Sequence, residues 1–160
     1  MKESQIFDLC VEETQRTMRG NIGGPFGAAI IDEKGVLVCV ASNTVLGDND
    51  PTAHAEMNAI RKATKIMGTH DLSGCTLYAT GYPCPMCLSA IIWANIKKVV
   101  VACGIDYAEE IGFRDDFIYQ FIEGDCQDKE VLDIDFSEQE STDKCDALYT
   151  EYARQGKEMY

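Results

Sequence analysis

Hydrophobic and polar residues follow two different periods over the first seventy residues of the chain. Apolar residues spaced three and four apart over 4–18, and again over 52–67, predict two amphipathic helices. Two runs rich in apolar residues, 26–31 and 36–41, predict strands, and the polar segment 32–35 between them predicts a hairpin turn. The chain therefore opens as helix, strand, strand, helix.

Strand and helix patterns continue to alternate after Gly68, which ends the second helix. We expect strands at 75–80 and 97–103, with a helix over 85–94 between them that begins with a proline. Such alternation favours an α/β fold, in which a mixed sheet is covered by helices on both faces to give three layers, α/β/α.

The pattern weakens beyond Gly104. Helices are expected at 115–121 and 140–156, and 131–136 is interpreted as a short strand. At 160 residues and 46% hydrophobic content, the chain is long enough for one well-buried core and too short for two ordinary domains. We therefore expect a single domain over 1–160.

The beginning of the chain carries no secretory pattern. Its first five residues are mostly charged or polar, and neither an apolar core nor a small-residue cleavage site follows them. Nowhere does an apolar run reach the roughly 20 residues that span a bilayer. We therefore expect a cytoplasmic protein with no membrane partner.

The charge balance is strongly acidic, with 14 basic and 27 acidic residues and a formal net charge of −13. Between Asp106 and Asp146, fifteen acidic residues stand against three basic ones. Because nucleic-acid affinity rests largely on Lys and Arg that neutralise phosphates, this composition argues against a polynucleotide substrate. A solvated acidic face that aids solubility is the simpler interpretation.

The residues with the most specific chemistry lie at the starts of two predicted helices. His54 and Glu56 fall in the first turn of one, and Cys84 and Cys87 open the other. Of the eight cysteines only these two form a close pair, and the rest are interpreted as small apolar residues or bystanders. One His and two Cys complete the protein ligands of a catalytic zinc site, so we expect one Zn²⁺ per subunit with a water or hydroxide as fourth ligand.

Glu56 suits a role in proton transfer beside such a metal. Zinc lowers the pKa of water to roughly 7, so that hydroxide can attack an amidine-like ring carbon. Loss of ammonia then needs one group that takes the proton of the water and returns protons to the ring nitrogen and the leaving amine. Taken alone, the Cys-x-x-Cys pair equally suits a redox pair or half of a structural zinc site, so a zinc-binding module without catalysis stays open.

These motifs resemble a known family. His-x-Glu followed by Pro-Cys-x-x-Cys is the motif pair of zinc-dependent base deaminases. The chain is similar to the cytidine deaminase-like superfamily, and within it to the small bacterial guanine deaminases. The likeness covers about residues 20 to 120, and the matching positions are 23–28, 43, 50–56, 83–87, 112–113, 115 and 117–119.

The resemblance implies a cytidine deaminase-like three-layer fold with a central mixed five-stranded sheet, and hydrolytic deamination of guanine to xanthine and ammonia. In guanine deaminases of this fold, the C-terminal segment crosses to a partner subunit and closes its site. A homodimer swapped through about 137–160 is therefore implied as well. The site residues that the resemblance implies are His54, Cys84 and Cys87 for zinc, Glu56 and Asp115 for catalysis, and Phe26, Asn43, Ala55, Trp93 and Tyr160 for the base.

Several of these assignments have alternatives. Phe26 equally suits the hydrophobic core, Asn43 a turn and Asp115 an ordinary helix start. Trp93 suits helix packing with an edge on the pocket, and Tyr160 a disordered end of the chain. Guanosine and cytosine remain alternative substrates, whereas deamination of tRNA adenosine calls for a basic surface that the charge count does not provide. Tyr82 precedes Pro83 where the family usually has a glutamate, and Arg114 stands where an acid is common, so the choice of ring stays open.

Overall fold

The computed structural model describes residues 1–160 and divides the chain into two compact units, Met1–Asp115 and Asp116–Tyr160. The boundary lies before residue 137, where the sequence predicts that a separable C-terminal segment begins. A single domain over the whole chain therefore stays a prediction, and we describe each unit by itself. No helix is both long enough and apolar enough to cross a bilayer.

The first unit is built on a mixed sheet of four strands in the order β2-β1-β3-β4. Strand β1 pairs antiparallel with β2 and with β3, whereas β3 and β4 run parallel. The mixed sheet is confirmed, but the predicted fifth strand is wrong, because residues 131–136 form no strand and β4 ends the sheet. The strands are β1 Gly27–Ile31, β2 Leu37–Ser42, β3 Thr76–Gly81 and β4 Lys98–Cys103.

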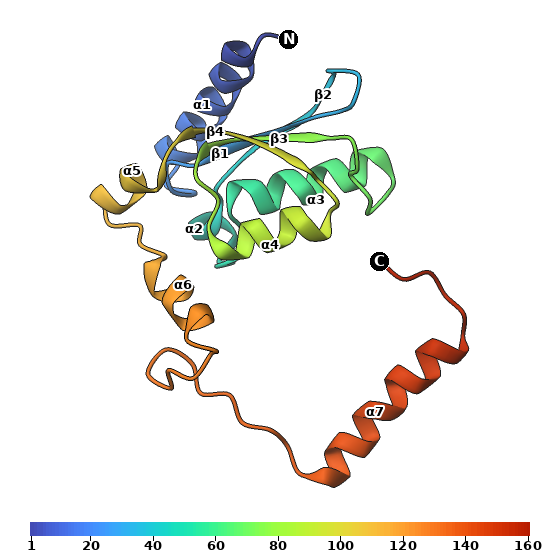
Figure 1. Ribbon diagram of the computed structural model, residues 1–160. Coiled ribbons are helices and arrows are strands. Elements are labelled where there is room, and N and C mark those ends of the chain that lie inside the picture. Colours follow the sequence, from blue (N-terminus) through green and yellow to red (C-terminus); the bar gives the residue numbers. More distant parts are fainter. The chain divides into compact units, whose positions relative to one another are not determined.

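Helices cover both faces of this sheet, as Figure 1 shows. Helix α1 (Glu3–Arg19) packs on one face, where its Ile6 and Cys10 contact Ala29 and Ile31 of β1. Helices α3 (Ala55–Met67) and α4 (Pro85–Trp93) lie on the other, against Ala28 and Ile30 of the same strand. Because side chains alternate between the faces of a strand, one apolar strand supplies both cores. The predicted α/β/α layering is confirmed.

Two loops set where the helices of the first unit begin and end. Helix α3 starts at Ala55, three residues later than predicted, because Asp50 Oδ1 accepts hydrogen bonds from the backbone nitrogen (2.8 Å) and hydroxyl (2.7 Å) of Thr52. That turn keeps 50–52 out of the helix. Gly68 ends α3 at φ +68°, as predicted. Two short helices, α2 (Val45–Asp48) and α5 (Ile105–Glu110), lie in segments where no helix was expected.

The second unit consists of two helices and the segments around them. Helix α6 spans Asp116–Glu123 and α7 spans Gln139–Arg154, both within a few residues of the predicted bounds. None of its residues is buried in the described chain. Along α7 an exposed apolar stripe is formed by Leu148, Tyr149 and Tyr152. This unit therefore has no apolar core of its own.

Candidate metal centre and active site

Two helix N-termini meet at one point of the first unit. His54 is the N-cap of α3 and Cys84 is the N-cap of α4, and Pro85 occupies the first turn of α4, where a proline costs no hydrogen bond. The Nδ1 atom of His54 lies 3.6 Å from Sγ of Cys84 and 3.6 Å from Sγ of Cys87. The three residues named from the sequence as zinc ligands therefore converge, although they come from two helices that are 30 residues apart in the chain.

The spacing of these atoms matches a tetrahedral metal site. With Zn–S near 2.3 Å and Zn–N near 2.0 Å, tetrahedral geometry separates a sulfur from a nitrogen ligand by about 3.6 Å. The ligand atoms of His54, Cys84 and Cys87 all lie within 4.8 Å of one another. Cys87 is fully buried and the other two are partly exposed, so the cluster is reached from one side. Soft thiolates with one imidazole are a donor set that suits zinc.

The two thiols of the cluster differ in acidity. The hydrogen bond between the two thiols lowers the pKa of Cys84 to about 4, with help from His54 and against the effect of burial. The same bond, together with burial, raises the pKa of Cys87. The hydrogen bond to Cys84 also raises the pKa of His54. The pair thus carries one negative charge readily, and a metal cation supplies the charge that removes the second proton.

Glu56 lies beside the cluster, in the first turn of α3, and is only 7% exposed. Burial raises the pKa of Glu56. A hydrogen bond to its own backbone and contacts with His54 and Cys87 lower the pKa, against the effect of burial. A carboxyl group whose neutral form is stabilised in this way accepts a proton more readily than a solvated carboxylate does. The site therefore holds a candidate proton carrier next to a candidate metal centre.

Two aromatic rings stand near the start of β1. The rings of Phe26 and Phe113 are edge to face, with centroids 5.1 Å apart and planes at 89°. Phe26 is partly buried and packs against the core cluster that includes the alanines of α3, as its core role requires, whereas stacking on a base stays a prediction. A side chain at Gly81 would crowd this ring, since an added Cβ would lie 3.3 Å from Phe26 Cδ1.

Asn43 is 5% exposed and is fixed by its own amide oxygen. Its Oδ1 accepts hydrogen bonds from the backbone N–H of Gly24 (3.1 Å) and of Val45 (3.2 Å). An added Cβ at Gly23 would lie 2.6 Å from that oxygen, so only glycine allows the chain to pass so close. Because the oxygen is committed to two backbone donors, the side chain offers a ligand its N–H₂ group alone.

The remaining residues named from the sequence lie in different places. Ala55 is fully buried as the first residue of α3, where the backbone N–H has no partner within the helix. Trp93 is 72% exposed at the far end of α4, about 13 Å from the cysteine end at 1.5 Å per residue. Within the chain it is not brought to the cluster. Asp115 ends the first unit and Tyr160 ends the second. Their roles, like that of Trp93, stay predictions.

Sequence reasoning missed one polar residue on α3, Asn58. Its amide nitrogen donates hydrogen bonds to the backbone of β2 and to Thr44. A signal for it was present, because Asn58 lies three positions after Ala55 and one before Ala59, on a helix face that is otherwise made of buried alanines. A polar residue at such a position needs a partner for its amide group.

Comparison with known proteins matches the first unit to a described family. The family model of the cytidine and deoxycytidylate deaminase zinc-binding region matches residues 1–103. The guanine deaminase of Bacillus subtilis is 46% identical over 114 residues, which are 71% of this chain and 72% of that protein. A tRNA-specific adenosine deaminase of Aquifex aeolicus is 39% identical over 62% of this chain and 65% of that protein.

Solved structures extend the likeness to the second unit. The crystal structure of the Bacillus subtilis guanine deaminase matches with a TM-score of 0.87 and 36% identity, covering 100% of this chain and 99% of that one. The guanine deaminase of Nitrosomonas europaea matches with a TM-score of 0.67 and 31% identity, over 71% of this chain and 65% of that one. The first of these likenesses therefore includes the C-terminal segment, which the family model does not reach.

Proposed function

Because the chain belongs to the cytidine and deoxycytidylate deaminase family, we propose that it is a zinc-dependent aminohydrolase that converts guanine to xanthine and ammonia. The observation that carries the reaction type is the cluster of His54, Cys84 and Cys87 with the buried carboxyl of Glu56 beside it. The observation that favours guanine is the match to a guanine deaminase structure over the whole chain.

His54, Cys84 and Cys87 would hold zinc, which would supply the Lewis acidity that eases the loss of a proton from water. Glu56 takes up that proton and then delivers protons to the ring nitrogen and to the departing amine. One C–O bond forms and one C–N bond breaks, so water and guanine give xanthine and ammonia. The burial of Glu56 suits this role, because it raises the pKa of the carboxyl and so favours uptake of a proton.

The groups around the cluster suit a flat ring that carries hydrogen-bond acceptors. Phe26 offers an aromatic face for stacking, with Phe113 against it. Asn43 and Ala55 both offer N–H donors, from an amide and from a helix N-terminus. Guanine presents a carbonyl oxygen and unprotonated ring nitrogens as acceptors for such donors. We assign Asn43 and Ala55 to the ring edge and Phe26 to its face.

The C-terminal unit completes the proposed enzyme in a homodimer. It has no buried residue and carries the apolar stripe on α7, so that a second subunit is a suitable cover for it. We propose that Asp115, Trp93 and Tyr160 act in the assembled dimer, with the segment 137–160 reaching the site of the partner. One Zn²⁺ per subunit, a water as fourth ligand and a cytoplasmic location belong to the same proposal.

Ammonia release from a panel of substrates tests this function. The purified zinc-loaded protein is offered guanine, guanosine, cytosine, adenine and a tRNA anticodon stem-loop. Turnover of guanine at least tenfold above the others is expected. Preference for another ring would keep the reaction type and overturn the substrate. Zinc binding without turnover of any member would favour the alternative of a structural zinc module.

A further inference from the structure

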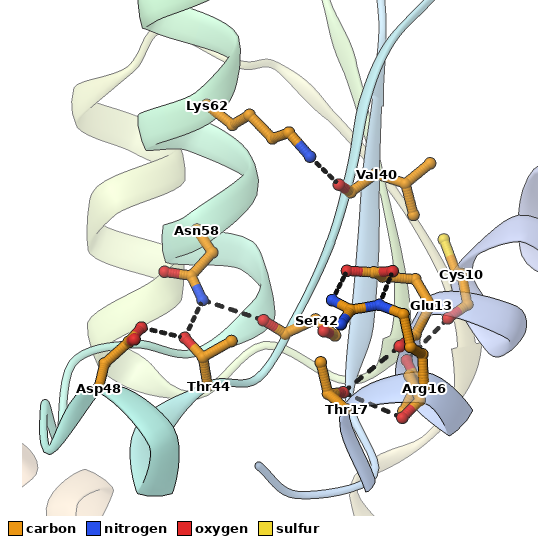
Figure 2. Close-up of polar contacts among 11 residues, drawn as sticks. Cys10, Glu13, Arg16, Thr17, Val40, Ser42, Thr44, Asp48, Asn58 and Lys62 are labelled. Carbon is orange, nitrogen blue, oxygen red and sulfur yellow. Dashed lines mark hydrogen bonds and ion pairs between the residues drawn. The ribbon is translucent and has the colours of Figure 1, made fainter. Parts of the chain in front are cut away.

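Asn58 joins the end of β2, the loop after it and the residue before His54. Its Nδ2 donates to the carbonyl oxygen of Ser42 (2.9 Å) at the end of β2 and to the hydroxyl of Thr44 (2.8 Å), and it lies 3.4 Å from the carbonyl oxygen of Ala53. Figure 2 shows the first two of these bonds. An amide has two N–H donors, so both are used by the short bonds and the third contact shares one of them.

The hydroxyl of Thr44 can act only as an acceptor toward Asn58. Thr44 donates its single proton to Asp48 Oδ2 at 2.6 Å, as Figure 2 also shows. Its lone pairs are therefore left for Asn58. The backbone N–H of Thr44 in turn donates to Ala53 O at 3.0 Å. The chain from Ser42 to Asp48 is thus tied to α3 and to the residue before His54.

Asn43 stands between the two residues that Asn58 holds. The amide of Asn43 is oriented by two backbone N–H groups, that of Val45 in the same loop and that of Gly24, nineteen residues earlier in the chain. A shift of Ser42 or Thr44 moves Asn43 and the Val45 donor relative to Gly24, and so turns the amide. A hydrogen bond weakens steeply once its angle falls, so a small turn costs most of a contact between Asn43 and a ligand.

We propose that Asn58 is a positioning residue, which holds the amide group of Asn43 toward the substrate ring and so sets the affinity for the ring edge. The ring contact rests on the proposed function, whereas the effect of Asn58 on Asn43 does not depend on which ring is bound. Asn58 touches neither the proposed zinc ligands' side chains nor the proton carrier through any hydrogen bond. Its effect therefore falls on substrate binding more than on the chemical step.

The same helix supplies a matched control. Lys62, one turn further along α3, donates to the carbonyl oxygen of Val40 at 3.0 Å, two residues before Ser42 on the same strand. Lys62→Met thus removes another side-chain hydrogen bond from α3 to β2, one that contacts neither Ser42 nor Thr44. If Asn58 acted only by fastening α3 to β2, Lys62→Met should change the same readouts at Asn43.

A double-mutant cycle on substrate kinetics is the first test. Asn58→Ala should raise KM for guanine about tenfold, the loss expected for one hydrogen bond, while kcat changes less than threefold. Asn43→Ala should raise KM by a similar factor, and Asn58→Ala added to it should raise KM by less than twofold. Asn58→Asp keeps the shape and removes both donors, so it replaces the alanine variant if that one folds poorly. The proposal would be overturned if the fold-changes in KM of Asn43→Ala and Asn58→Ala multiply in the double variant. It would also be overturned if Lys62→Met raises KM as much as Asn58→Ala does.

Amide hydrogen exchange tests the same proposal without any substrate. Asn58→Ala should speed exchange of the Gly24 and Val45 amides at least fivefold, whereas Lys62→Met should leave both unchanged. Unchanged exchange in Asn58→Ala overturns the positioning role. Failure of the wild-type protein to turn over guanine instead overturns the proposed function, and the cycle is then run on the ring that it does deaminate. The two failures are thereby told apart.

Discussion

His54 Nδ1 lies 3.6 Å from Cys84 Sγ, although 30 residues separate the two in the chain. Each residue caps the N-terminus of a different helix, so the contact exists because α3 and α4 pack on one face of the sheet with their N-termini together. Backbone N–H groups at both termini favour negative charge at this point. The geometry therefore stabilises a thiolate before any metal binds.

Loss of one ligand of this cluster should remove the metal. Cys87→Ser is expected to lower zinc affinity by well over tenfold, because even changes around a metal ligand cost about 10–100-fold. Zinc content is measured after dialysis against a weak chelator. Cys126→Ser, which changes an exposed cysteine outside the cluster, should retain full zinc. Equal zinc in both variants would remove Cys87 from the ligand set.

Glu56→Gln should abolish turnover and leave the metal in place. The amide fills the same volume but cannot carry the proton, so kcat should fall by at least about 10²–10⁴-fold, the contribution of a general acid–base group. Zinc content and the thermal midpoint serve as controls. Both should be retained, because a glutamine side chain places no charge in this buried position. Activity within threefold of the wild type would show that another group moves the protons.

Gly23→Ala should weaken substrate binding through Asn43. The added methyl group would collide with the backbone carbonyl of Asn43 and lie 2.6 Å from its Oδ1, so the Asn43 loop has to move away. We expect KM for guanine to rise about tenfold, as for the loss of one hydrogen bond, with zinc content unchanged. Gly104→Ala is the control, since an added Cβ there meets nothing within 4 Å. Indistinguishable KM values for the two variants would argue against a close fit at Gly23.

A swapped C-terminal segment predicts complementation between two inactive proteins. Glu56→Gln lacks the proton carrier, and a variant without residues 157–160 lacks the tail. Mixed dimers would combine an intact Glu56 from one subunit with an intact tail from the other, so activity should return after the two are unfolded and refolded together. Each variant refolded alone is the control. No recovery from mixtures that contain heterodimers would place each tail on its own subunit.

Acid should loosen the loop that precedes His54. Hydrogen bonds from the hydroxyl and backbone of Thr52 hold the pKa of Asp50 below its usual 3.8, with a smaller contribution from Arg61. A lowered pKa in the folded state contributes stability that is complete above the unfolded value and lost as the pH falls through the folded value. Asp50→Asn should therefore lower the thermal midpoint at pH 7, and the difference should shrink below about pH 4. A difference that is constant from pH 7 to pH 3 would exclude this linkage.

The order of the main elements could be predicted from the sequence because their signals are local. The period of apolar residues, the polar turn at 32–35 after β1, Gly68 after α3 and Pro85 at the start of α4 each act over a few residues. The identity of His54, Cys84, Cys87 and Glu56 as a set also followed from the chemistry of their side chains. Metal-ligand types and spacing carry that information without coordinates.

Tertiary structure decided what depends on residues far apart in the chain. The strand count is one case, since residues 131–136 alternate like a strand, but a strand forms only where a neighbour pairs with it. The orientation of Asn43 is another, because it depends on Gly24, nineteen residues away, and on Asn58, a residue with no motif of its own. Local sequence determined the elements and the ligands, whereas packing of α3 against β2 decided how the site is held, because hydrogen bonds between distant segments exist only in the folded chain.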